Sequence, residues 1–109
     1  MNRGHLKQSI IEEEGLKLSL YKCPADKWTI GVGHNLESRG ISKEIAMAIL
    51  DEDIDVCLKE LEQNFAHYND YPAKVQETLI DLCFNLGISR LMKFQKTIEY
   101  LTEGLSTGN

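Results

Sequence analysis

The chain has 109 residues, of which 42% are apolar and 27% are charged, a composition typical of one globular domain. Its formal net charge is −5, and its lysines and arginines are dispersed along the sequence. This balance argues against nucleic acid or an anionic membrane surface as the main partner, because both repel an acidic protein that lacks a basic patch.

The first forty residues predict a short helix followed by a β-hairpin. Leu6, Ile10 and Ile11 recur at helical spacing, and Gly15 can end the helix as a C-cap. The run LKLSLYK alternates with period two and predicts a strand, and CPADK carries turn residues. The run WTIGVGH predicts one return strand, and NLESRG is expected to form a loop.

From Ser42 onward the pattern predicts helices. Ser42 is a suitable N-cap, and Pro72 and Gly87 suit the start and the end of a later helix. We expect four helices with these apolar positions, in chain order: Ile45, Ala46, Ile49 and Leu50; Ile54, Cys57, Leu58, Leu61 and Phe65; Val75, Leu79, Leu82, Cys83 and Leu86; Leu91, Phe94, Ile98 and Leu101. The predicted fold class is α+β, a single domain over 1–109 with a hairpin lobe at about 15–40 and a helical part at about 42–104.

The cysteines indicate a reducing compartment and no metal site. Cys23, Cys57 and Cys83 are odd in number and widely spaced, and no Cys/His cluster has zinc spacing. The N-terminal run MNRGHLKQSIIEEEG lacks an apolar stretch, so we expect neither a signal peptide nor a membrane anchor. Synthesis in the cytoplasm is therefore expected.

Three consecutive glutamates precede Gly15, and helical geometry separates them. A run of this kind is usually a solvated face. At about 100° per residue, however, Glu14 lies about 40° from Ile10, on the apolar side, whereas Glu12 points nearly opposite. Partial burial and the nearby helix C-terminus would both favour the protonated form of Glu14. A carboxyl group kept protonated near neutral pH can act as a general acid.

Cys23 and Thr29 come from the predicted turn and return strand. Each alone is weak evidence, since Thr29 fits any strand and a cysteine before proline is often merely small. Cys23 could also pair with His34 as the dyad of a cysteine hydrolase, although no third residue is evident that would orient the histidine. His5 and His67 are expected at the surface.

The run EGLKLSLYKCPADKWTIGVGH resembles the active-site segment of the phage-type lysozymes. That family carries Glu, eight residues, Asp or Cys, five residues and Thr, which Glu14, Cys23 and Thr29 match. The run FNLGISRLMKF resembles the family's helix–loop–helix motif across the cleft. The resemblance spans nearly the whole chain, and the cysteine at position 23 is an accepted form of the motif.

The resemblance implies cleavage of the β-1,4 bond between N-acetylmuramic acid and N-acetylglucosamine in peptidoglycan, without a metal or organic cofactor. Glu14 would protonate the glycosidic oxygen, and Cys23 and Thr29 would place water on the opposite face, the inverting geometry. Asn85 and Gly33 would contact substrate. His34 and Asp53 would form a structural ion pair.

Two departures from the family suggest alternatives. Members of the family commonly continue for several more helices, so C-terminal helices are expected to be missing here, and the acidic balance is unusual for an enzyme of the anionic cell wall. The alternative function is a lysozyme-like binding or regulatory module without turnover. Bare apolar stripes on the last helices predict a homodimer or a higher species, or else a marginally stable monomer with weak activity. Without a signal peptide, the protein would leave the host bacterial cytoplasm for the cell wall on lysis.

Overall fold

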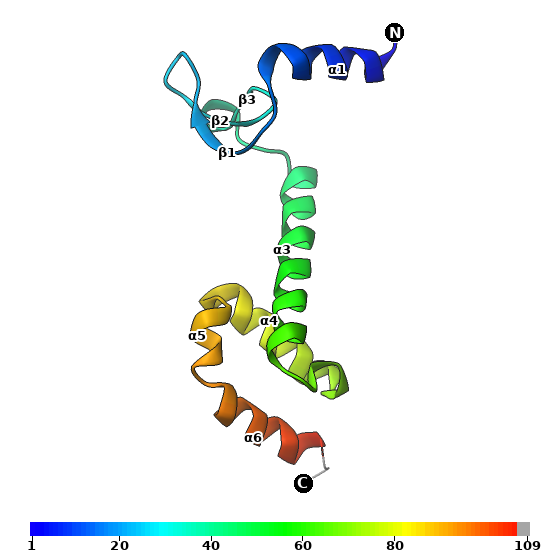
Figure 1. Cartoon of the computed structure of the whole chain (residues 1–109), viewed down its shortest axis with the longest axis vertical. Coiled ribbons are helices and arrows are strands. Elements are labelled where there is room, and N and C mark those ends of the chain that lie inside the picture. The colour runs from blue at the N-terminus through cyan, green and yellow to red at the C-terminus, as the bar shows by residue number, and fades with distance from the viewer. Residues whose placement is uncertain (107–109) are drawn as a thin grey trace. The chain divides into compact units, whose positions relative to one another are not determined.

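The chain folds into two units, Met1–Ile45 and Ala46–Asn109, in a computed structural model that describes the backbone of residues 1–106 and the side chains of residues 1–100. The first unit carries a small antiparallel sheet, and the second consists of helices (Figure 1). This content confirms the predicted α+β class. The prediction of a single domain stays a prediction.

The first unit begins with helix α1 (Arg3–Glu14), whose two ends are capped. The Asn2 side chain accepts a hydrogen bond of 3.0 Å from the His5 N–H, and the Gly15 N–H donates to the Ile11 carbonyl at 2.7 Å. Gly15 has a φ of 78°, a left-handed value that favours glycine. The predicted end of this helix is therefore confirmed.

The sheet has the order β1 (Lys17–Lys22), β2 (Trp28–Gly31) and β3 (His34–Asn35), each strand antiparallel to its neighbour. The single return strand predicted over WTIGVGH is wrong, because the chain reverses between β2 and β3. Gly31 and Gly33 make this reversal possible with φ values of 73° and 65°. These two glycines thus form a tight turn.

The loop predicted over NLESRG is also wrong, because Leu36–Arg39 forms the short helix α2. The Asn35 side chain caps it by accepting a hydrogen bond of 3.0 Å from the Ser38 N–H. Asparagine is a preferred N-cap residue, and Gly40 follows the last turn at a φ of 61°. The signals for this helix were therefore present in the sequence.

Helix α3 (Lys43–Asn64) is one continuous helix of 22 residues where two were predicted. No glycine or proline lies within α3, so nothing in the backbone interrupts the helix. Ser42 caps it as predicted, accepting a hydrogen bond of 3.2 Å from the Ile45 N–H.

The remaining helices are the 3₁₀ turn η1 (Tyr68–Asp70), α4 (Ala73–Leu86), α5 (Ile88–Met92) and α6 (Gln95–Ser106). Pro72 and Gly87 flank α4 as predicted. The single helix expected over Leu91–Leu101 is instead divided between α5 and α6. The Lys93 and Phe94 N–H groups bond three residues back, which tightens the chain and ends α5. The Leu101 side chain lies outside the described residues.

The core lies in the second unit, mainly between α3, α4 and η1. Its buried side chains are Cys57, Leu61, Phe65, Tyr68, Tyr71, Leu79, Cys83 and Leu91. The first unit differs, because Thr29 is the one buried residue among its described side chains. A unit of this size buries too small a share of its surface to form a large core of its own.

Candidate active site

Glu14 is the last residue of α1 and is exposed. The sequence predicted partial burial, and that prediction is wrong. Leu6 and Ile10, on the same face, are 47% and 40% exposed, and α1 has no buried residue. The physical reason is the small size of the first unit, which offers no core against which a helix face can pack. The expected protonation of Glu14 therefore loses its support from burial.

The turn between β2 and β3 brings Gly33 against the Glu14 side chain. A β-carbon placed on Gly33 would lie 3.2 Å from the Glu14 carboxylate oxygen Oε2 and 3.6 Å from its carboxyl carbon. No equivalent contact exists at Gly31, whose added β-carbon would meet nothing within 4 Å. Gly33 was predicted to contact substrate. That contact stays a prediction, and the structure shows that the absence of a side chain at Gly33 leaves room for the Glu14 carboxylate.

Cys23 and Thr29 lie together on either side of the β1–β2 turn. The Cys23 N–H donates to the Lys27 carbonyl at 3.0 Å, and the Thr29 hydroxyl donates to the same carbonyl at 2.8 Å. Thr29 is only 2% exposed, whereas Cys23 is partly exposed. Two residues of the predicted catalytic set are therefore neighbours, as their spacing suggested.

The turn also sets the chemistry of the Cys23 thiol. Hydrogen bonding from the Lys27 backbone, with smaller contributions from the Ala25 backbone and the Thr29 hydroxyl, lowers the pKa of Cys23 against a weaker opposing effect of burial. The Thr29 hydroxyl donates its hydrogen to the Lys27 carbonyl, and its oxygen lone pairs can still accept a hydrogen bond. The pair can therefore hold a water molecule through one sulfur and one oxygen atom.

His34 is held within the first unit by Gly40. Its Nε2 lies 2.6 Å from the Gly40 carbonyl oxygen. Because a carbonyl oxygen only accepts, Nε2 must carry the hydrogen, and Nδ1 is left to accept or, once protonated, to donate. This contact gives His34 a structural role. Its predicted ion pair with Asp53, which lies on α3 in the other unit, stays a prediction.

Asn85 lies on the exposed surface of α4. Its Nδ2 donates to the Asp81 backbone carbonyl at 2.8 Å and to the Asp81 carboxylate at 3.3 Å. These local bonds leave the amide oxygen available to a ligand. Asn85 belongs to the second unit, so its predicted contact with substrate stays a prediction.

Sequence reasoning missed Glu37, the residue of α2 that supports the strand carrying Thr29. Its Oε1 accepts a hydrogen bond of 3.2 Å from the Trp28 N–H, and its Oε2 lies 3.6 Å from Lys27 Nζ. The Trp28 N–H, followed by the charge of Lys27, lowers the pKa of Glu37. The available signal was Asn35, an N-cap that places Glu37 in the first turn of a helix.

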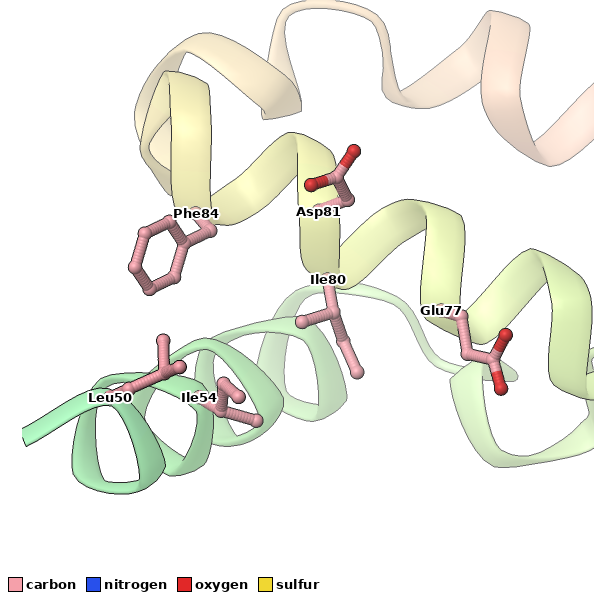
Figure 2. Close-up of a pocket in the computed structure, with 6 residues that line it drawn as sticks. All are labelled: Leu50, Ile54, Glu77, Ile80, Asp81 and Phe84. Atoms are coloured by element: carbon pink, nitrogen blue, oxygen red, sulfur yellow. The ribbon is translucent and has the colours of Figure 1, made fainter. Parts of the chain in front are cut away.

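A separate pocket of about 300 Å³ lies between α3 and α4 in the second unit. Figure 2 shows Leu50 and Ile54 on α3 facing Ile80 and Phe84 on α4, and Glu77 and Asp81 also line the pocket. None of these residues belongs to the predicted catalytic or substrate-binding set. The pocket is mainly apolar, so it does not by itself indicate a sugar-binding site.

Comparison with known proteins gives a family match and a relative. The family model for phage lysozyme matches residues 11–106, a range that includes Glu14, Cys23, Thr29 and Asn85. The protein named "Probable T4-type lysozyme 2" of Dictyostelium discoideum is 24% identical over an alignment of 127 residues, which covers 90% of this chain and 75% of that protein. Within the described residues, no helix is long and apolar enough to cross a membrane.

Proposed function

The chain belongs to the phage lysozyme family, and on this premise we propose that it cleaves the β-1,4 bond between N-acetylmuramic acid and N-acetylglucosamine. Membership of the family supports a peptidoglycan hydrolase in general terms. The specific bond and the mechanism are proposed from the residues of the first unit. The substrate is the glycan strand of the bacterial cell wall.

Glu14 is the proposed general acid that protonates the glycosidic oxygen as the bond breaks. Its carboxylate lies at the end of α1 and over Gly33, so two elements of the unit define its position. An incoming glycan strand would remove water from the exposed Glu14 side chain.

Cys23 and Thr29 are proposed to orient the attacking water. Thr29 is buried and fixed by Lys27, so its oxygen is a rigid acceptor, while the partly exposed Cys23 sulfur reaches solvent. Attack by water on the face opposite to Glu14 gives the inverting outcome, without a covalent intermediate. We do not assign the Cys23–His34 dyad, because the Nε2 of His34 is engaged by the Gly40 carbonyl.

The observation that carries this proposal is that one small unit holds all three motif residues, with Cys23 beside Thr29 and Glu14 over Gly33. Its test is the clearing of a turbid peptidoglycan suspension by wild type, Glu14→Gln and Glu12→Gln. Glu12 is a matched control, since it is exposed on the same helix. We expect Glu14→Gln to abolish clearing and Glu12→Gln to retain it.

Failure of the wild type to clear the suspension, although it still binds the insoluble peptidoglycan, would favour the alternative function, a binding module without turnover. Equal activity of Glu14→Gln and wild type would reject the proposed acid. A pull-down with insoluble peptidoglycan, run beside the turbidity assay, separates binding from turnover.

Self-association of the chain is a further part of the proposal. Phe84 and Phe94 are 47% and 57% exposed, which supports pairing of two copies through the apolar side chains of the second unit. Light scattering at micromolar concentration should give the mass of a dimer, and a monomer at all concentrations would reject this.

We also propose synthesis in the host bacterial cytoplasm with release to the cell wall on lysis, which fractionation of infected or expressing cells tests.

A further inference from the structure

Two cysteines that are far apart in the sequence meet in the core of the second unit. Cys57 on α3 is 7% exposed, and Cys83 on α4 is 2% exposed. Both are free thiols. Glu60 lies three residues after Cys57, on the same face of α3, and its side chain is half-buried. The two sulfur atoms and one carboxylate oxygen of Glu60 all lie within 4.8 Å of one another.

The carboxylate is the unusual member of this group. The surrounding core is apolar, and no ion pair compensates Glu60 within the part of the chain that the structure describes. Glu60 therefore places a carboxylate beside two buried thiols without an ion pair among the described residues, an arrangement that a bound cation would relieve.

The spacing fits a tetrahedral ion with sulfur and oxygen ligands. Zinc–sulfur bonds are about 2.3 Å and zinc–carboxylate bonds about 2.0–2.2 Å, so ligand atoms around one zinc ion lie roughly 3.4–3.8 Å apart. The observed separations, all within 4.8 Å, need at most about 1 Å of adjustment to reach this geometry. Two thiolates select soft or borderline ions such as Zn²⁺ and Cd²⁺ over Mg²⁺ and Ca²⁺.

We propose that Cys57, Glu60 and Cys83 form a binding site for a thiophilic divalent cation of the zinc class, which joins α3 to α4. On binding, each thiol gives its proton to solvent and the sulfur becomes a metal-bound thiolate, so no oxidant is required. Glu60, as the half-buried member, marks the side from which the ion enters and on which water completes the fourth position. The site is independent of the cell-wall chemistry proposed above.

The test uses the full chain, reduced and freed of metal with a chelator, and titrated with Cd²⁺ and Zn²⁺. Thiolate-to-cadmium charge-transfer absorption reports sulfur ligation directly, and thermal unfolding reports the coupling to stability. We expect saturation at one equivalent and a rise in Tm with Zn²⁺. Cys57→Ser should weaken binding at least about tenfold, because even partners outside the ligand set contribute about 10–100-fold to metal affinity.

Two matched controls test whether the cluster itself is responsible. Cys23→Ser removes the partly exposed thiol of the first unit, and Glu52→Gln removes an exposed carboxylate from the same helix as Glu60. Both should bind cadmium as the wild type does. If Cys57→Ser fails to fold, Glu60→Gln replaces it, since this half-buried side chain is not part of the apolar core.

Four outcomes would overturn the proposal. The first is the absence of saturable binding, and the second is loss of binding in Cys23→Ser with retention in Cys57→Ser. The third is an equal affinity for Cd²⁺ and Zn²⁺ in Glu60→Gln, Glu52→Gln and the wild type. Formation of a Cys57–Cys83 disulfide in air, with no metal binding under reducing conditions, would also reject the site.

Discussion

The contact between Gly33 and Glu14 allows activity to be separated from stability by a pair of glycine substitutions. Gly33 and Gly31 have similar left-handed φ values, 65° and 73°. Replacing either glycine with alanine forces a β-carbon into this region, which costs about 1–2 kcal/mol. The Tm of the two variants should therefore fall by similar amounts, about 4–8 °C for every kcal/mol lost from the free energy of unfolding.

The two substitutions differ in what the new methyl group meets. At position 33 it would lie 3.2 Å from the Glu14 oxygen Oε2, closer than the 3.4 Å at which ordinary contact begins, so the carboxylate must move by a few tenths of an ångström. At position 31 the methyl group meets nothing within 4 Å. Since a displacement of 1 Å can cost about 100-fold in rate, a few tenths of an ångström should cost roughly 3- to 10-fold.

The assay is the initial rate of peptidoglycan clearing, measured well below the Tm of both variants, with Tm recorded in parallel. Gly33→Ala should be several-fold slower than Gly31→Ala at equal loss of Tm. Equal rates in the two variants would refute the reasoning, because Gly33 would then act only through its backbone conformation. A fully active Gly33→Ala would show that the contact between position 33 and Glu14 does not affect the reaction.

Three further predictions concern other parts of the molecule. Because hydrogen bonds from the β1–β2 turn lower the pKa of Cys23, its alkylation by iodoacetamide should reach half-maximal rate at a lower pH than that of N-acetylcysteine, and coincident pH profiles would contradict this. Burial raises the pKa of Tyr68, so the folded protein keeps a proton that the unfolded chain loses, and the free energy of unfolding should fall as pH rises above the ordinary value of 10.0. Tyr68→Phe should flatten this decline. It also removes the 2.9 Å hydrogen bond from the Tyr68 hydroxyl to the Gln76 carbonyl, so it should lower the free energy of unfolding at neutral pH by about 1–3 kcal/mol. An unchanged alkaline slope in Tyr68→Phe would show that Tyr68 does not cause the decline. Leu61 is fully buried, so Leu61→Ala should cost about 2–5 kcal/mol in a denaturant titration, and a loss below about 1 kcal/mol would mean that α3 does not form the core described here.

The sequence predicted the elements that local chemistry determines. Gly15 and Gly87 end α1 and α4 at the predicted residues, because each takes a left-handed conformation that other residues avoid. Ser42 caps α3 through its side chain for an equally local reason. The division of α3 into two helices was wrong, since no glycine or proline interrupts the backbone between them.

The part of the candidate site that lies within the β1–β2 hairpin was predictable. The short turn between Cys23 and Thr29 brings these residues together, and their proximity follows from spacing alone. The exposure of Glu14 was not predictable, because it depends on what packs over α1 rather than on the helix itself. The meeting of Cys57 with Cys83 was missed for the same reason, since it depends on how α3 packs against α4.

The most direct test of the proposed muramidase activity is the identity of the sugar at the new reducing end. Peptidoglycan digested by the wild-type protein is reduced with borohydride, and the reduced ends are identified by mass spectrometry, with Glu14→Gln digested in parallel. Cleavage at the proposed bond predicts reduced N-acetylmuramic acid from the wild type and none from Glu14→Gln. Reduced N-acetylglucosamine, or equal release of either sugar by the two proteins, would contradict the account.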